Sequence, residues 1–223
     1  MVLGLLTIAA IPTTIGVCEG VSQQKEKNKQ DADAERLAKF HADVFCGARS
    51  SKRRFIHGSR VVLRNDKAYL QKPSQTKPAA HPLSAFYIQY PDEEREATRG
   101  LVSTIAYDPP MLNWLYVDKD TLEVKYGNRT QSRQHHVGPW DWTEPDQEGL
   151  TFEGREQFVA VREEDEGDEE DGPEGGVWAL FFDRNEDHLK SLGEKRPVLE
   201  ISLERKLLPK PEELKKMEED RKK

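Results

Sequence analysis

Residues 48–64 carry six basic side chains and no acidic one. The six are Arg49, Lys52, Arg53, Arg54, Arg60 and Arg64. Such a run could bind an anionic membrane surface, because each basic residue close to anionic lipid contributes about 1 kcal/mol. RNA phosphates attract the same cations. The structural alternative is a solvated loop, or a loop that faces the acidic segment 163–175 of the same chain.

A second candidate site is the segment HHVGPWDW (135–142). Its two tryptophans are two residues apart, so an extended chain turns both to one side, where they could stack on a ligand ring or a sugar. The alternative is that they plug one end of the core. His135 and His136 would point to opposite faces of a strand and could not easily share a metal. The side chains predicted to line a ligand cavity are Trp114, Tyr116, Trp140 and Trp142.

Familiar catalytic and metal-binding motifs are absent from the sequence. It contains no GxSxG, no Walker or dinucleotide-binding glycine pattern, and no Cys/His cluster with zinc spacing. We therefore assign no catalytic residue, no metal ligand and no cofactor. The two cysteines, Cys18 and Cys46, are too few for a disulfide-stapled scaffold and fit reduced thiols. Asn128-Arg129-Thr130 is a glycosylation sequon, relevant only in the secretory lumen.

The composition limits the classes of partner. Hydrophobic residues are 35% and charged residues 34% of the chain, so part of it is expected to be solvated while the rest carries the core. The formal net charge of -7 makes nucleic acid an unlikely general partner.

The first 21 residues form an apolar N-terminal segment, with no charge from Val2 to Val17. This run is shorter than the roughly 20 residues that span a bilayer, and a longer window includes Glu19. Three lysines within 25–29 favour a membrane anchor that keeps the rest of the chain in the cytosol. Two alternatives stay open. One is a secretory signal peptide, although its usual basic start is missing, and the other is an apolar arm that packs on the protein itself.

Residues 22–47 are polar at first and then amphipathic. The apolar residues that fall at helical spacings are Leu37, Phe40, Val44 and Phe45. With Gly47 as a stop, this pattern predicts a helix whose second half packs on the following domain.

Residues 48–208 are predicted to form a β-rich domain. Alternating apolar and polar residues predict hairpins over 60–70, around Asn65-Asp66, and over 112–127. Further strands are predicted at 85–90, 100–107, 157–162, 177–183 and 197–208. About eight to ten short strands, without a strand–helix–strand rhythm, indicate a mainly β fold, an antiparallel sandwich or a small barrel.

Two charged segments lie within and after this domain. Residues 163–176 are mostly acidic, with glycine and proline, and predict a disordered loop between two strands. Residues 209–223 are a charged tail or short helix, because Pro211 suits a first helical position and Glu212 with Lys216 is a supportive pair.

Several stretches resemble a family of short proteins from filamentous ascomycete fungi that has no assigned activity. They are IPTTIGVCEGVSQQ, ARSSKRRFIHG, PPMLNWLYVDKDTLEVKYGNRTQSRQHHVGPWDWT and VWALFFD. The resemblance covers most of the chain except the acidic loop and the C-terminal tail. It implies a fungal source and a single small domain, and it implies no catalytic residue.

These observations favour a non-enzymatic, membrane-associated binding or adaptor protein. Its β domain would face the cytosol, the basic residues would contact anionic headgroups, and a protein partner of unknown identity would complete the adaptor role. One alternative is a small-molecule-binding β-barrel or enzyme with an aromatic cavity, for a lipid or another ligand. The other is a secreted fungal protein.

Overall fold

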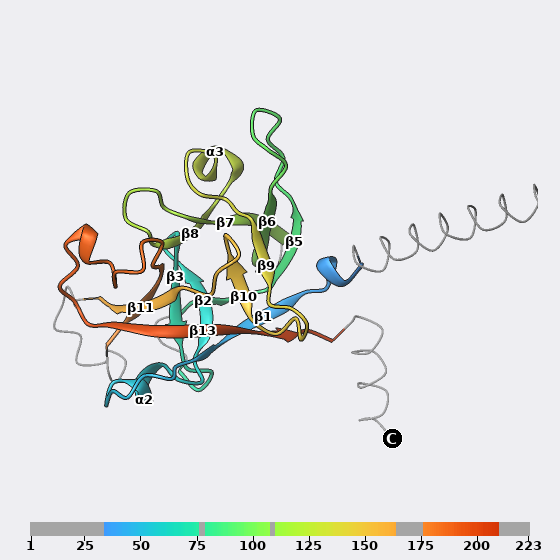
Figure 1. Cartoon of the computed structure of the whole chain (residues 1–223). Coiled ribbons are helices and arrows are strands. Elements are labelled where there is room, and N and C mark those ends of the chain that lie inside the picture. Colours follow the sequence, from blue (N-terminus) through green and yellow to red (C-terminus); the bar gives the residue numbers. More distant parts are fainter. Residues whose placement is uncertain (1–33, 76–78, 108–109, 164–175, 210–223) are drawn as a thin grey trace, which may run out of the picture. The chain divides into compact units, whose positions relative to one another are not determined.

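The computed structural model describes residues 34–75, 79–107, 110–163 and 176–209 (Figure 1). The chain divides into two units, residues 1–37 and 38–223, and a helical turn at 34–37 is all that is described of the first. The segments predicted at 1–21 and 209–223, and most of the acidic loop, fall almost entirely outside the described residues. Every strand of the described ranges belongs to the second unit.

Six strands of this second unit enclose the core as a barrel. They are β1 (Phe40–Phe45), β5 (Ala85–Gln89), β6 (Arg99–Tyr107), β9 (Trp140–Trp142), β10 (Leu150–Phe152) and β13 (Val198–Leu207). Antiparallel ladders join β13 to β1, β1 to β5 and β5 to β6. The separate β9–β10 sheet completes the ring. On one side an ion pair between the side chains of Arg99 and Asp141 joins β6 to β9, and on the other a β-bridge between Gly149 and Glu204 connects the start of β10 to β13. A closed ring leaves few unpaired edges.

Three hairpins lie against each other at one end of this barrel. They are β2 (Arg60–Arg64) with β3 (Lys67–Gln71), β7 (Pro110–Val117) with β8 (Val124–Gly127), and β11 (Phe158–Arg162) with β12 (Trp178–Phe182). β3 pairs with β8 and with β12, and Glu123 bridges Phe181. Each hairpin stands between two barrel strands in the sequence, so the unit repeats one four-strand pattern three times.

Short elements complete the described chain. They are β4 (His81–Pro82), α2 (Arg53–Ile56), α3 (Arg129–Ser132) and a 3-10 turn at Lys190–Leu192. In all, thirteen strands occur in the described residues, more than predicted. The mainly β class and the strands predicted from alternation are confirmed, and closure of the ring makes the fold a barrel.

The helix predicted over residues 22–47 is wrong for its last part, where Phe40–Phe45 form β1. Phe40, Ala42 and Val44 are buried, while the residues between them are more exposed. A run as short as FHADVF fits both the helical spacing and the period of two, and pairing with β13 decides between them. The β domain therefore begins before residue 48.

Turn chemistry places the hairpin ends. Asn65 and Asp66 both adopt positive φ, 49° and 63°, as a two-residue hairpin turn requires. In the β7–β8 hairpin the amides of Asp120 and Thr121 donate to the Asp118 carboxylate, which closes the turn. These two ends, with Glu163 at the end of the third hairpin, bring several charged residues into contact.

Candidate functional site

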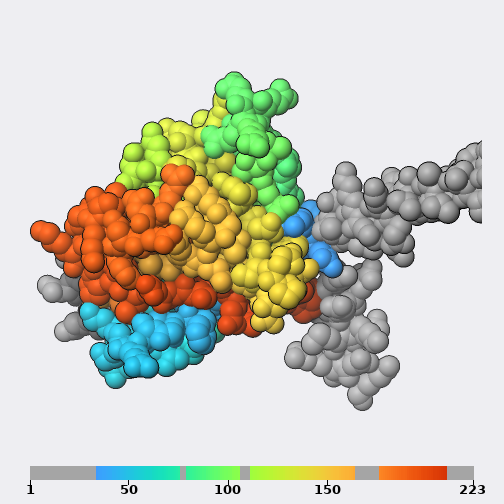
Figure 2. All heavy atoms as spheres, in the orientation of Figure 1, coloured from blue at the N-terminus to red at the C-terminus, as the bar shows by residue number. Residues whose placement is uncertain are grey.

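The loop between β1 and β2, residues 47–58, is called the basic loop. It leaves the barrel after Cys46 and returns at Ser59, and α2 forms its middle. Ile56 is fully buried and anchors it, whereas Arg49, Arg53 and Arg54 are exposed and Lys52 is half-buried. In Figure 2 this segment lies within the blue patch below the red of β13. The structure therefore brings four of the six predicted basic residues onto one surface loop.

No carboxylate that the structure describes pairs with the four cations of the basic loop. Arg53 Nε donates to the Cys46 carbonyl oxygen at 2.7 Å, and the Arg54 guanidinium lies 4.7 Å from the Phe55 ring centroid. Among residues 34–75, 79–107, 110–163 and 176–209, no ion pair joins Arg49, Lys52, Arg53 or Arg54 to an acid. Within these ranges, their positive charge is not neutralised by an ion pair.

The other two predicted basic residues lie on β2 and serve the fold. Arg60 Nε lies 2.8 Å from Asp43 Oδ1 on the neighbouring strand β1. The Arg64 guanidinium lies 4.7 Å from the Tyr69 ring centroid across the β2–β3 hairpin. The predicted cluster therefore divides into four residues on the basic loop and a structural pair on β2.

The four predicted cavity residues do not line one cavity. Trp140 and Trp142 are only 1% and 6% exposed and belong to the main core, where Trp140 packs against Phe152 at a centroid distance of 4.7 Å. Trp114 and Tyr116 belong to a second, smaller cluster with Tyr90 and Val137. Each pair lies two residues apart on one strand, β9 or β7, so its two side chains turn to the same side and pack within the protein.

Arg205 is a buried residue that the sequence interpretation missed. It lies on β13, is 8% exposed, and its guanidinium sits within a cage of three rings. The distances to the centroids of Trp142, Phe40 and Tyr87 are 4.4, 4.7 and 5.4 Å. Arg205 continues the alternation that turns Ile201 and Leu203 inward. A charged residue at an inward position of a predicted strand was the sequence signal that could have revealed this buried cation.

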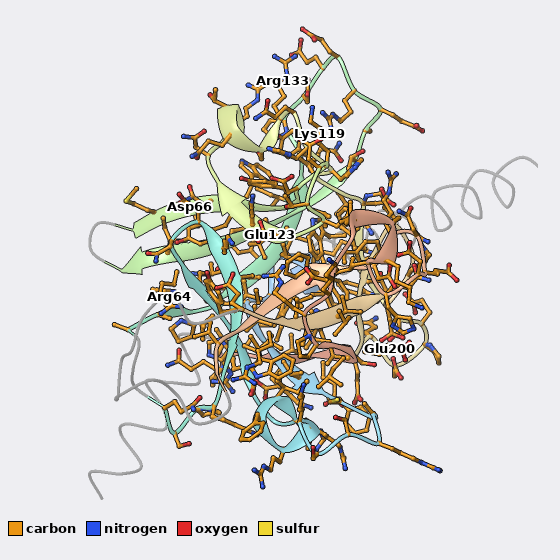
Figure 3. The ribbon with its side chains drawn as sticks, turned by 90° about the vertical axis from the view of Figure 1, so that its left-hand side faces the viewer. Arg64, Asp66, Lys119, Glu123, Arg133 and Glu200 are labelled. Carbon is orange, nitrogen blue, oxygen red and sulfur yellow. The ribbon has the colours of Figure 1, made fainter. Side chains whose placement is uncertain are left out.

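A network of charges joins the ends of the three hairpins. Lys67 Nζ lies 2.7 Å from Glu123 Oε1 and 3.2 Å from Glu163 Oε1, and Lys125 Nζ lies 2.9 Å from Asp118 Oδ2 and 3.1 Å from Glu123 Oε2. Figure 3 labels Glu123, and also Asp66, which precedes Lys67 in the β2–β3 turn. The members come from separate hairpins, so no local sequence pattern pointed to the network.

Hydrogen bonds set the ionisation of this network. Burial alone would raise the pKa of Asp118, but donation from Lys125 and from the backbone amides of Asp120 and Thr121 outweighs it and lowers the pKa to about 2. Burial likewise opposes ionisation of Glu123, yet hydrogen bonds from Lys67 and Lys125 lower its pKa. Both carboxylates are therefore charged at neutral pH.

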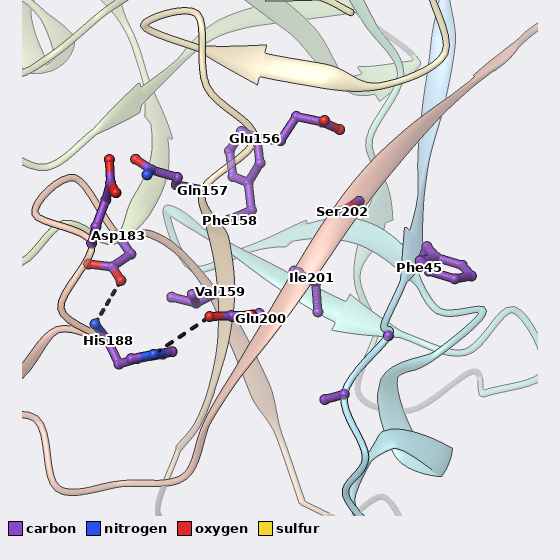
Figure 4. A pocket seen from close by; sticks show the side chains of 13 residues that line it. Phe45, Glu156, Gln157, Phe158, Val159, Asp183, His188, Glu200, Ile201 and Ser202 are labelled. Atoms are coloured by element: carbon purple, nitrogen blue, oxygen red, sulfur yellow. Dashed lines mark hydrogen bonds and ion pairs between the residues drawn. The ribbon is translucent and has the colours of Figure 1, made fainter.

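An open pocket of about 600 Å³ lies between β11, β13 and the start of the basic loop (Figure 4). Four carboxylates line it, from Glu156, Asp183, Glu186 and Glu200, and no lysine or arginine does. Phe45 at its edge is 45% exposed.

The same pocket contains an imidazole and an unpaired acceptor. His188 Nε2 lies 3.5 Å from Glu200 Oε1, and the His188 amide donates to Asp183. Gln157 Oε1 is buried without a hydrogen-bond partner among the residues that the structure describes. The pocket escaped sequence analysis because its lining comes from four distant segments.

Neither a metal site nor a membrane-spanning helix emerges from the described part of the chain. There, no group of three or more His, Cys, Asp or Glu residues is arranged to hold a metal ion. Within the same ranges no helix has the length and apolarity to cross a bilayer. The segment 1–21, predicted as an anchor, lies outside the described residues.

A six-stranded barrel that three hairpins close at one end, built from three four-strand repeats, is a β-trefoil. The family model described as the fungal beta-trefoil domain matches residues 16–209. The chain therefore belongs to the fungal β-trefoil domain family, in agreement with the fungal source that the resemblance implied. No curated protein and no solved structure matches it.

Proposed function

We propose that this protein is a non-enzymatic, membrane-associated binding or adaptor protein whose basic loop contacts anionic headgroups. The observation that carries the proposal is the group of four cations at Arg49, Lys52, Arg53 and Arg54, which no described carboxylate neutralises. Arg60 on β2, by contrast, is paired with Asp43. A surface loop that keeps four cations unpaired suits an external polyanion.

The expected strength agrees with a surface contact. Each basic residue near an anionic leaflet contributes about 1 kcal/mol, so four supply about 4 kcal/mol before the cost of orienting the protein. Stable membrane attachment usually needs a second signal beside a basic patch. The apolar run from Val2 to Val17, predicted as an anchor, would be that signal. The negative cytosolic leaflet is the matching surface, so the β domain would face the cytosol.

Vesicle co-sedimentation of the full chain tests the proposal. Binding is compared on phosphatidylcholine vesicles with and without phosphatidylserine, so that the anionic lipid alone is varied. Replacing Arg49, Lys52 and Arg54 by Gln should remove about 3 kcal/mol of the gain from phosphatidylserine, or about 150-fold in affinity. Arg53 is kept because its side chain holds the Cys46 carbonyl.

The matched control removes the same net charge elsewhere. Lys119, Lys190 and Lys195 are exposed and have no ion pair in the described residues, so their Gln variants should leave vesicle binding within about threefold of the unmodified chain. An equal loss of binding in both triple variants would show that overall charge, not the basic loop, determines the contact. Unchanged binding in the first variant would refute the proposal.

A second candidate function is the binding of a small organic cation in the acidic pocket. The observation that favours it is the 600 Å³ hollow with four carboxylates, the exposed Phe45 ring and the unpaired Gln157 oxygen. Aromatic rings and carboxylates both attract ammonium and guanidinium groups.

A thermal-shift series with spermidine and with neutral polyols of similar size would test the pocket. Spermidine should raise the melting temperature of the unmodified chain and should fail to do so after Glu156 and Glu200 are replaced by Gln. Glu148→Gln, at an exposed position that does not line the pocket, is the control. A spermidine effect that survives the double replacement would exclude this pocket as the binding site.

A further inference from the structure

Ser51 lies in the centre of the basic loop, at an exposed position. Its neighbours differ from it: Ser50 is half-buried and its Oγ accepts the Lys52 amide at 3.3 Å. The backbone bonds here join Arg53 N to Ser50 O and Phe55 N to Lys52 O, and neither involves Ser51. Within the described ranges, the Ser51 hydroxyl has no hydrogen-bond partner, which leaves its Oγ open to a reagent.

The charged residues closest to Ser51 in the sequence are all positive. Arg49 precedes it by two residues, and Lys52, Arg53 and Arg54 follow directly. Ile56, with the partly buried Ala48 and Phe55, anchors the loop to the folded core, and the segment 49–54 contains no strand. An enzyme with an acidic substrate groove would recognise this arrangement through charge complementarity.

We propose that Ser51 is a phosphorylation site that switches the basic loop off the membrane. The step transfers the γ-phosphoryl group of ATP, bound by a protein kinase that selects basic segments, to Ser51. An O–P bond forms at Ser51 Oγ, the bond from the γ-phosphorus to the β,γ-bridging oxygen breaks, ADP leaves, and the hydroxyl proton passes to the base of the kinase. This proposal rests on the membrane contact of the basic loop.

The phosphate would act through the charges already described. It carries a charge of about −1.5 to −2 at pH 7 and pairs readily with lysine and arginine. Its charge offsets about two of the four cations. Each lost positive charge weakens binding to anionic vesicles about fivefold, so the phosphate should weaken it about 30-fold.

The experiment phosphorylates the full chain with a filamentous-fungal extract, ATP, Mg²⁺ and phosphatase inhibitors, and maps the product by mass spectrometry. The repurified chain is then divided, half is treated with phosphatase, and both halves are sedimented with phosphatidylcholine–phosphatidylserine vesicles. We expect phosphate on Ser51, a recovery of binding of about 30-fold after phosphatase, and no phosphatase effect in Ser51→Ala. Ser51→Glu should weaken binding about fivefold, whereas Ser74→Glu, at another exposed loop position, should not.

Three outcomes would overturn the proposal, and they are distinguishable. A product without phosphate on Ser51, or with phosphate only on Ser50, would show that Ser51 is not the phosphorylation site. Phosphate on Ser51 with unchanged vesicle binding would show that the modification does not control the membrane contact. In that case a loss of binding in the Arg49, Lys52 and Arg54 variant would still support the membrane contact itself. If that unphosphorylated triple variant binds as well as the unmodified chain, the membrane contact itself fails and the switch fails with it.

Discussion

The strongest prediction concerns Asp118, whose carboxylate ties one hairpin to the charge network. Its pKa falls from 3.8 to about 2 in the folded protein. At about 1.36 kcal/mol per pKa unit, this difference corresponds to about 2 kcal/mol of stability at neutral pH. The side chain is only 10% exposed, so solvent screening reduces this value little.

The sign of the pH dependence follows from the lowered pKa. A carboxyl group that ionises more easily in the folded state stabilises that state above its unfolded pKa, near 3.8. The stabilisation is lost as the pH falls toward the folded value of about 2. About 1 kcal/mol should therefore remain at pH 3.

The variant Asp118→Asn tests this reasoning by urea denaturation at pH 7 and pH 3. It should lower the free energy of unfolding by about 2 kcal/mol at pH 7 and by about 1 kcal/mol at pH 3, because the asparagine oxygen still accepts backbone amides but no longer attracts Lys125. Asp120→Asn is the matched control, since Asp120 is exposed in the same turn. A cost that is equal at both pH values would refute the electrostatic origin.

Two further substitutions test the barrel. Arg205→Lys should lower the free energy of unfolding by about 1–2 kcal/mol, because a compact ammonium cannot stack on three rings at once; an unchanged urea midpoint would contradict the cage. Gly138→Ala places a Cβ atom in steric conflict with the Arg99 carbonyl oxygen and should cost about 1–3 kcal/mol in the same assay. The control Gly47→Ala meets only Phe45, at 3.8 Å, and should cost far less.

Local patterns were sufficient to predict much of the fold. The alternation of Leu199, Ile201 and Leu203 predicts β13, and the turn residues Asn65 and Asp66 predict the first hairpin; both elements are present. The shortest strands escaped prediction. β9 and β10 have three residues each, too few for a period to stand out, although they pair with each other across a short loop.

The candidate site was predictable only where it is contiguous. Arg49, Lys52, Arg53 and Arg54 are close in sequence, and a single loop keeps them together. The structural roles of Arg60 and Arg64 depend on Asp43 and Tyr69, whose positions follow from strand pairing. The acidic pocket and the hairpin network are assembled from distant segments, so only the tertiary fold reveals them.

The ladder between β1 and β13 has a consequence for how the chain folds during synthesis. Phe40 lies opposite Leu207 in this ladder. The edge of β1 that pairs with β13 therefore stays unpaired until β13, the last strand of the barrel, has been synthesised. Until then Phe40 and Val44, both buried in the finished protein, remain in contact with water or with chaperones. Such distant pairing carries a large entropic cost and predicts slow folding, on a scale of milliseconds to seconds, that is completed only after β13 has left the ribosome.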